Sequence, residues 1–455
     1  MLETQEQFSS QYSHILFKYR CPMTDRTFSG KDRWLLPEGI QEVLPQQAEY
    51  LEKLRRELLD LFHTWGYELV IPPIIEYLES LLIGTSNDLD VQTFKLIDQL
   101  TGRLMGVRAD MTPQVARIDA HRLKREAPTR LCYMGTVLRT YPEGFARTRS
   151  PMQIGAELYG HAGIESDVEV LHLLVETLAV TGVKQVHIDL GHVGIFRALA
   201  HDAGLDAGQE MTLFDALQRK ARPEIEDLLA QVKTSAAHRH WLTRLVDLNG
   251  GEAVLDEARS LFKKAGAPVL AALDNLQQIA ALAQRRMPSI PLHFDLAELR
   301  GYHYQTGVVY AAFVPGHGQE IARGGRYDDI GRVFGRARPA TGFSADLITL
   351  ISLSAVQMQS QPPDQVRAIL APCMDGGSCT SLGSPHLCAG QDAQELPPAD
   401  DDAELQVAVR ELRSQGERVI YALPGARGDA AEMGCDRVLE RRNGQWVVVK
   451  LMGAR

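Results

Sequence analysis

The segment LCYMGTVLRTYPEGFARTRSPMQIGAELYG (131–160) decides the fold, because it predicts two β-strands joined by an arginine-bearing loop. In its second half, apolar residues alternate with Gln153, Gly155 and Glu157. Alternate residues of a strand face opposite sides of a sheet, so Gln153 and Glu157 point the same way. Gly155 lies between them and leaves room for a ligand against the strand.

Cationic side chains lie at the loop end of this hairpin. Arg139 ends the first strand, and Arg147 and Arg149 follow in the loop. Beside Gln153 and Glu157, three guanidinium groups would make a socket for a zwitterion or a phosphate-bearing molecule. An ordinary hairpin with a charged tip accounts for the same residues, and this stretch by itself leaves both interpretations open.

Length and composition predict a globular chain of two or three domains. It has 455 residues, 45% of them hydrophobic, and a formal net charge of -10, which disfavours general affinity for a nucleic-acid backbone. No apolar run reaches the roughly 20 residues of a membrane span, and residues 1–22 lack the pattern of a signal peptide. The six cysteines form no CxxC pair, so we expect a cytoplasmic protein without a metal site.

The rest of the chain predicts an α+β fold in which a mostly antiparallel sheet carries helices. The predicted segments are a disordered extension (1–31), a core (32–353) with a helical insertion at about 193–286, a linker (354–366), and a small α/β region (367–455) with a disordered insert at about 374–402.

Polar residues mark the starts of two helices in the core. Asp110 and Thr112 precede a helix, and either could cap its N-terminus, which would place Asp110 at the mouth of the sheet. Ser166 and Glu169 have the spacing of a capping box.

Ordered segments over residues 33–353 resemble the catalytic core of a class II aminoacyl-tRNA synthetase of the histidyl type. They are GYELVIPPIIE (66–76), similar to the dimerisation motif 1; VRADMTPQVAR (107–117), similar to the segment LRPEGT; residues 133–160, similar to motif 2; LRGYHYQTGVVY (299–310) and ARGGRYDDI (322–330), similar to two histidine-associated segments; and TGFSADLITL (341–350), in the place of motif 3.

The departures from the synthetase pattern concentrate at the ATP end. Thr349 stands where motif 3 places an arginine against the ATP phosphates, and losing that cation removes charge stabilisation. Asp110 replaces the glutamate of LRPEGT, and Tyr304 is followed by Gln305 where the synthetase has a tyrosine pair. The resemblance therefore implies a retained amino-acid pocket and degraded ATP machinery.

Four further segments resemble the family of ATP phosphoribosyltransferase regulatory subunits, which are synthetase paralogues: DRWLLPEGI (32–40), YLESLL (77–82), RADMTPQVARIDAH (108–121) and DLGHVGI (189–195). This resemblance implies a noncatalytic partner of a short catalytic subunit, with no cofactor of its own. The complex would join ATP to phosphoribosyl pyrophosphate in the first step of histidine biosynthesis, under inhibition by L-histidine. The implied assembly is a hetero-octamer of four and four, with a self-dimer through the motif 1-like region and no nucleic acid or membrane.

The resemblance also implies a set of histidine-binding residues. They are Asp110, Thr112, Arg139, Gln153, Glu157, Arg300, Tyr304 and Tyr327. Two roles stay open: Glu157 could instead pair with an arginine, and Arg139 could merely brace the loop.

Two other functions compete with the regulatory one. An active histidyl-tRNA synthetase would catalyse histidine-driven ATP–pyrophosphate exchange, which Thr349 argues against. A sensor module that binds histidine or RNA would copurify with RNA rather than with a phosphoribosyltransferase.

Overall fold

The computed structural model describes residues 34–83, 87–142, 148–299, 304–357, 368–373, 399–423 and 430–451. The chain divides into two compact units, one comprising Met1–Val43 and Lys53–Ser354, the other Leu44–Glu52 and Ala355–Arg455. The extension predicted for residues 1–31 lies outside the described residues, as do most of the predicted linker and most of the predicted insert.

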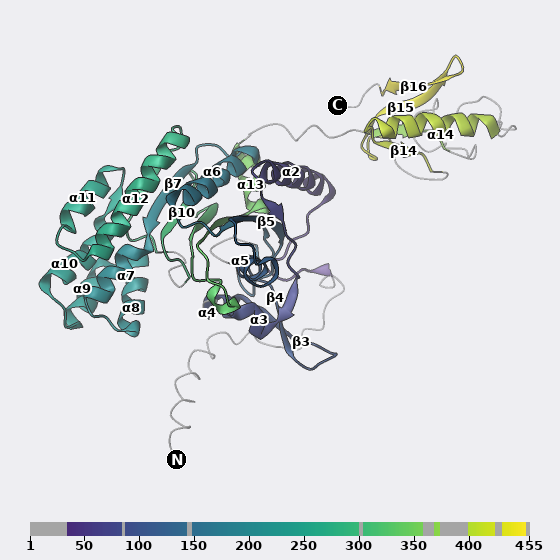
Figure 1. Cartoon of the computed structure of the whole chain (residues 1–455). Helices are drawn as coiled ribbons and strands as arrows, with labels where there is room; N and C mark the ends of the chain where they lie inside the picture. The colour runs from purple at the N-terminus through teal and green to yellow at the C-terminus, as the bar shows by residue number, and fades with distance from the viewer. Residues whose placement is uncertain are drawn as a thin grey trace. The chain divides into compact units, whose positions relative to one another are not determined.

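A nine-stranded sheet organises the first unit, in the order β1-β5-β6-β12-β11-β10-β7-β9-β8. Figure 1 labels its strands β5, β7 and β10. All its pairings are antiparallel except β1 with β5 and β7 with β9. The predicted α+β class is therefore confirmed. The strands are β1 (Glu68–Leu69), β5 (Thr129–Thr136), β6 (Met152–Tyr159), β7 (His187–His192), β8 (Asn249–Gly250), β9 (Leu292–Asp295), β10 (Val308–Phe313), β11 (Ala322–Arg326) and β12 (Ala340–Asp346).

Helices cover one face of this sheet. Helix α6 (Ile164–Val180) contacts β6, β11 and β12 and buries apolar side chains at helical spacing, among them Leu171, Leu174 and Leu178. Helix α2 (Pro45–Thr64) adds Phe62, whose ring stands edge-on to Phe343 of β12 with 6.2 Å between centroids. Phe343 therefore points to the apolar face of the sheet, and the residues on either side of it in β12 point to the opposite face.

The capping box predicted at Ser166 and Glu169 is wrong. Helix α6 begins at Ile164, and Ser166 Oγ donates a hydrogen bond to the carbonyl oxygen of Gly163 at 2.7 Å. Glu169 accepts two hydrogen bonds from Arg130 and one from Tyr67. These partners are far away in the sequence, so local spacing could not reveal them.

Residues 193–286 are mainly helical, as the composition predicts. Helix α12 contacts α6, α7 and β7, and Figure 1 shows α8 to α11 gathered beyond α7 and α12. The sequence does not predict strand β8, because Asn249 and the following glycines favour turns. The helices are α7 (Val193–Asp202), α8 (Ala207–Gln218), α9 (Arg222–Gln231), α10 (Ala236–Arg244), the 3-10 turn Leu245–Asp247, α11 (Ala253–Leu261) and α12 (Ala267–Arg286).

A second, three-stranded sheet leads the chain into the first helix of the site. Its order is β2-β4-β3, and both pairings are antiparallel. Its elements and the helices around it are β2 (Ile75–Tyr77), α3 (Leu78–Leu82), α4 (Asn87–Gln92), β3 (Phe94–Ile97), β4 (Leu104–Val107), α5 (Thr112–Arg117) and a π-helical turn (Ile118–Leu123).

The second unit contains a four-stranded sheet in the order β14-β13-β15-β16. A hairpin turn at Asn443–Gly444 joins β15 to β16, with positive φ angles of 51° and 81°. Helix α14 begins at Ala399, within the segment predicted to be a disordered insert. The elements of this unit are β13 (Ala368–Ala371), α14 (Ala399–Ser414), β14 (Val419–Tyr421), β15 (Cys435–Arg442) and β16 (Gln445–Lys450). Helix α13 (Leu347–Gln357) precedes them in the chain and directly follows β12 of the nine-stranded sheet.

Within the described ranges, no helix combines the length and the apolar character that crossing a membrane requires.

Candidate functional site

The register of three neighbouring strands brings the polar residues of the hairpin together. Glu157 of β6 is paired with Gly342 of β12, and Gln153 is paired with Asp346. On the other side, Tyr133 of β5 is paired with Gly155. Paired residues of an antiparallel sheet share a face, so these side chains rise from the face opposite Phe343.

Glu157 lies at the inner end of this site. Its side chain is buried, and its carboxyl accepts hydrogen bonds from the hydroxyl of Tyr133 at 3.0 Å and from the hydroxyl of Tyr327. The Tyr133 hydroxyl is also 3.0 Å from that of Thr112. No ion pair between Glu157 and an arginine occurs among the described residues, which exclude Arg147 and Arg300.

Two glycines make room for this carboxyl. A Cβ atom at Gly342 would collide with Glu157 Oε2, and one at Gly155 would collide with the hydroxyl of Tyr133. Any larger residue at either position would displace the carboxyl or its donor. The spaced glycine in β6 therefore accommodates a neighbouring side chain of the protein itself.

Burial, together with the nearby charge of Asp110, raises the pKa of the Glu157 carboxyl from 4.5 to about 8, although hydrogen bonds from Tyr327, Tyr133 and Thr112 lower it. A buried carboxyl that lacks a cation is costly to ionise. A ligand that brings N–H donors or a positive charge would favour the ionised form.

Gln153 joins the strand to the start of helix α5. Its Oε1 accepts from the backbone N–H of Met111 at 2.9 Å, and its Nε2 donates to Asp110 Oδ1 at 2.8 Å. The same oxygen of Asp110 accepts from the N–H of Thr112, so Asp110 satisfies the helix terminus. The structure thus brings Asp110, Thr112, Gln153 and Glu157 to one place.

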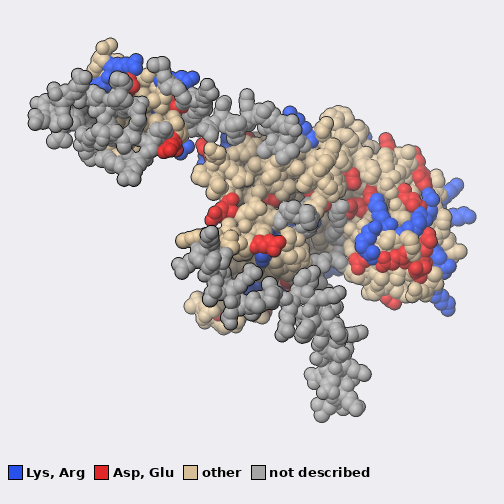
Figure 2. Space-filling view, turned by 180° about the vertical axis from the view of Figure 1, so that it is seen from behind, with Lys and Arg blue, Asp and Glu red and all other residues tan. Residues whose placement is uncertain are grey.

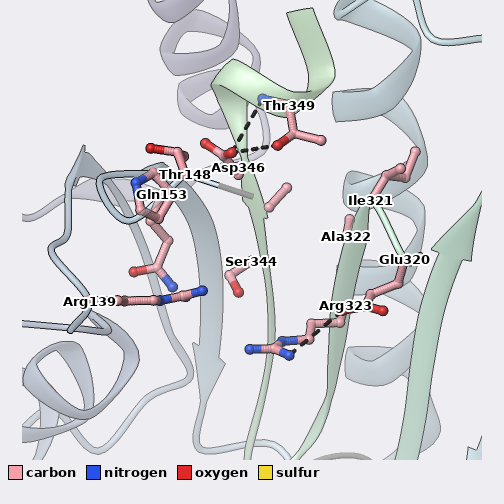
Figure 3. Close-up of a pocket in the computed structure, with 12 residues that line it drawn as sticks. Arg139, Thr148, Gln153, Glu320, Ile321, Ala322, Arg323, Ser344, Asp346 and Thr349 are labelled. Atoms are coloured by element: carbon pink, nitrogen blue, oxygen red, sulfur yellow. Dashed lines mark hydrogen bonds and ion pairs between the residues drawn. The ribbon is translucent and has the colours of Figure 1, made fainter. Parts of the chain in front are cut away.

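Beyond Gln153 the site opens into a pocket. Arg139 and Arg323 point into it, with Ser344 of β12 between them (Figure 3). Arg139 Nε also reaches the Ala109 carbonyl oxygen at 3.4 Å, so this side chain both borders the pocket and braces a loop. The full lining is Arg139, Thr148, Pro151, Gln153, Glu320, Ile321, Ala322, Arg323, Ser344, Ala345, Asp346 and Thr349.

Asp346 and Thr349 close the outer end of the pocket. The Thr349 hydroxyl donates to Asp346 Oδ2 at 2.5 Å, and the N–H groups of Ile348 and Thr349 also donate to this carboxylate (Figure 3). Across the strands, the N–H of Met152 donates to Asp346 Oδ1 at 3.0 Å. The outer end therefore holds a carboxylate that backbone and hydroxyl donors already satisfy.

The two predicted tyrosines take different places. Tyr327 is buried and donates to Glu157, whereas Tyr304 is 38% exposed and contacts the Tyr327 ring edge-on, with 6.4 Å between centroids. Arg147 and Arg300 lie outside the described residues.

Arg326, the last residue of β11, fixes the end of the strand that leads into Tyr327. Its buried guanidinium donates twice to Asp167 of α6, at 3.0 and 3.1 Å, and to Asp328 and Ser166. Sequence reasoning missed Arg326 and Tyr133. Tyr133 could have been found, because it alternates with Leu131 in the predicted first strand, but its partner Glu157 is set by pairing alone.

No cluster of three or more His, Cys, Asp or Glu side chains that could hold a metal ion occurs in the described parts of the chain.

Comparison with known families covers both parts of the chain. The sequence model of the histidyl-tRNA synthetase family matches residues 39–350, and that of the ATP phosphoribosyltransferase subunit HisZ C-terminal domain matches residues 396–449. The ATP phosphoribosyltransferase regulatory subunit of Thioalkalivibrio sulfidiphilus is 61% identical over 424 residues, which cover 93% of this chain and 100% of that protein. The one from Alkalilimnicola ehrlichii is 55% identical over 426 residues, 93% of this chain and 99% of that protein.

Solved structures show the same likeness. An ATP phosphoribosyltransferase regulatory subunit/histidyl-tRNA synthetase from Bacillus halodurans matches with a TM-score of 0.72 and 25% identity, over 88% of this chain and 96% of that one. Histidyl-tRNA synthetase from a Nostoc species matches with a TM-score of 0.66 and 18% identity, over 93% of this chain and 95% of that one, a likeness of fold alone.

Proposed function

The chain belongs to the family of ATP phosphoribosyltransferase regulatory subunits, and we propose that L-histidine is its effector and binds at the inner end of the pocket. Its role is regulatory, within histidine biosynthesis, and it is not itself the catalytic subunit. The observation that carries the proposal is the buried Glu157 carboxyl, whose hydrogen-bond partners are tyrosine hydroxyls. An imidazole offers the N–H donors that such a carboxyl can hold.

The remaining groups suit the rest of a histidine molecule. Asp110 and Thr112 would bind the ammonium group, because a carboxylate and a hydroxyl both accept hydrogen bonds. Arg139 would bind the carboxylate, since a guanidinium matches a carboxylate in shape and charge. Arg300, Tyr304 and Tyr327 complete the proposed set.

The charges at the outer end argue against the competing function, that of an active synthetase. The carboxylates of Asp346 and Glu320 line the pocket together with the guanidinium groups of Arg139 and Arg323. The two carboxylates oppose a triphosphate, because like charges at close range disfavour binding. Thr349 adds no cation that would offset them, and its hydroxyl donates to Asp346. ATP–pyrophosphate exchange driven by histidine would contradict this argument.

A second copy of the chain would dock at the edge of the sheet beside β1, which is the outermost strand next to β5. Apolar side chains lie exposed along this segment, among them Leu69 (47%), Ile71 (81%) and Ile74 (61%). Clustered exposed apolar groups mark association sites. Substituting Ile71→Asp and Ile74→Asp should dissociate the dimer, as sedimentation velocity would measure.

The partner in the proposed assembly is the short catalytic subunit, in a hetero-octamer of four and four. Nucleic acid is not a proposed partner, because Lys and Arg alternate with Asp and Glu over the helical region (Figure 2). Arg222 with Asp247, Arg244 with Glu257 and Arg259 with Asp274 are pairs of this kind. The proposed compartment is the cytoplasm, in keeping with the free thiols of Cys132 and Cys435.

Reconstitution of the two subunits tests the function. The catalytic subunit should gain turnover and histidine sensitivity when the wild-type chain is added. With Glu157→Ala, turnover should be activated while inhibition by histidine is lost. The proposal fails if the catalytic subunit alone shows full turnover and full histidine sensitivity.

A further inference from the structure

Gln305 presents a buried hydrogen-bond acceptor that the described part of the chain leaves unsatisfied. Its side chain is 4% exposed, and its Oε1 atom has no hydrogen-bond partner among the residues that the structure describes. Burying an amide oxygen without a hydrogen-bond donor costs free energy, so such atoms are rare in folded proteins and need an explanation. One explanation is that a ligand supplies the missing N–H donor.

This oxygen lies next to the inner end of the site. A Cβ atom built on Gly325 of β11 would be 2.6 Å from Gln305 Oε1. Gly325 is paired with Gly342 of β12, and Glu157 Oε2 lies directly against Gly342. Paired Cα atoms of antiparallel strands are only about 4.5–5.5 Å apart. The amide oxygen and the carboxyl therefore flank neighbouring glycines, within reach of one small ring.

The backbone around Gln305 is held on two sides. The carbonyl oxygen of Gln305 accepts a hydrogen bond from Arg197 of α7 at 3.1 Å. The N–H of Thr306 donates to the Arg326 carbonyl oxygen at 2.7 Å, and the hydroxyl of Thr306 accepts from the N–H of Asp328 at 3.0 Å. These contacts preorganise the acceptor before any ligand arrives.

We propose that Gln305 Oε1 accepts a hydrogen bond from one ring nitrogen of the bound imidazole while the Glu157 carboxyl holds the other ring nitrogen. This inference rests on the proposed histidine site and adds a specificity-determining residue to it. The pocket then selects a ring with two unsubstituted nitrogens, because a methyl group on either nitrogen removes a hydrogen bond and adds bulk. Tyr304, which is more exposed, contacts the side of the bound ligand and makes no hydrogen bond to the ring nitrogens.

Methylated histidines test this assignment in the full-length chain. Isothermal titration calorimetry would compare L-histidine with its Nτ-methyl and Nπ-methyl derivatives. The wild type should bind both derivatives at least about tenfold more weakly than histidine. Gln305→Leu should bind histidine about tenfold more weakly and should stop discriminating against one methyl isomer, while it still rejects the other.

One variant serves as the matched control. Gln284→Leu makes the same change on the exposed face of α12 and should leave the discrimination intact. An equal loss for all three ligands in Gln305→Leu would overturn the assignment, as would wild-type protein that accepts either methyl isomer as well as histidine. The wild-type result stands even if the leucine variant does not fold. Absence of histidine binding to the wild type, alone and in complex, would instead overturn the proposed function.

Discussion

The inner and outer ends of the site both contain a carboxyl group, but the two groups have opposite surroundings. Glu157 is buried, and the side chains that hydrogen-bond to it are the uncharged hydroxyls of Tyr133, Tyr327 and Thr112. Asp346 is half-buried and accepts from three backbone N–H groups and the Thr349 hydroxyl. The donors around Asp346 satisfy its carboxylate without a ligand, whereas a buried carboxyl surrounded by hydroxyls alone can still gain from a charged or N–H-bearing ligand.

The largest expected loss of histidine affinity comes from replacing Glu157 at the inner end with a residue that cannot ionise. Glu157→Gln keeps the size of the side chain but cannot ionise, so L-histidine should bind roughly a hundredfold more weakly, on the order of a charged hydrogen bond. Calorimetry of the full chain measures this loss. Asp346→Asn is the matched control and should change histidine affinity less than about threefold. Equal losses in both variants would refute the contrast.

Removing one donor to Glu157 should have a smaller effect. In Tyr327→Phe the carboxyl loses one of its hydroxyl donors and keeps those of Tyr133 and Thr112, so its ionised form is less favoured and histidine should bind about tenfold more weakly. Tyr310→Phe removes a buried hydroxyl that donates to the Gly342 carbonyl oxygen instead. That control should lose stability and keep its affinity, as thermal unfolding and calorimetry together would reveal.

The raised pKa of Glu157 should be visible in the pH dependence of the free energy of unfolding. With a pKa raised from 4.5 to about 8, folded Glu157 keeps its proton where the unfolded chain has released it. The free energy of unfolding therefore falls as pH rises through this window, by at most about 1.4 kcal/mol per pH unit from this group. Denaturant unfolding of Glu157→Gln without ligand should lack that slope. Identical slopes in both proteins would contradict the raised pKa.

The smallest effect is expected at the outer end. Thr349→Val deletes the hydroxyl that donates to Asp346, so unfolding should become easier by about 1 kcal/mol. Histidine affinity should stay within about threefold of the wild type. Thr349→Ser, which retains the hydroxyl, should match the wild type in both measurements. A large drop in histidine affinity would mean that the two ends are coupled.

The alternation in residues 152–159 was enough to place Gln153 and Glu157 on one face, and strand pairing agrees. The start of α5 was predicted only in part. Asp110 accepts from the N–H of Thr112, but the N-cap residue is Met111 rather than Asp110 or Thr112, and it makes no side-chain capping hydrogen bond. The strand register was not readable. Glu157 meets Tyr327 across 170 positions, and Met152 meets Asp346 across 194. Periodicity carries information about faces, but no information about which strands become neighbours.

The sequence by itself determined the fold class and the shared face of Gln153 and Glu157, because these follow from residue type and spacing. The missing cation at Thr349 is what the resemblance to motif 3 implies. Only the tertiary structure decided that Glu157 is buried against tyrosine hydroxyls, that Asp346 is already satisfied, and that Gln305 Oε1 has no donor among the described residues. Burial and hydrogen bonding depend on which distant segments pack together. That packing is set by the whole nine-stranded sheet and the helices behind it.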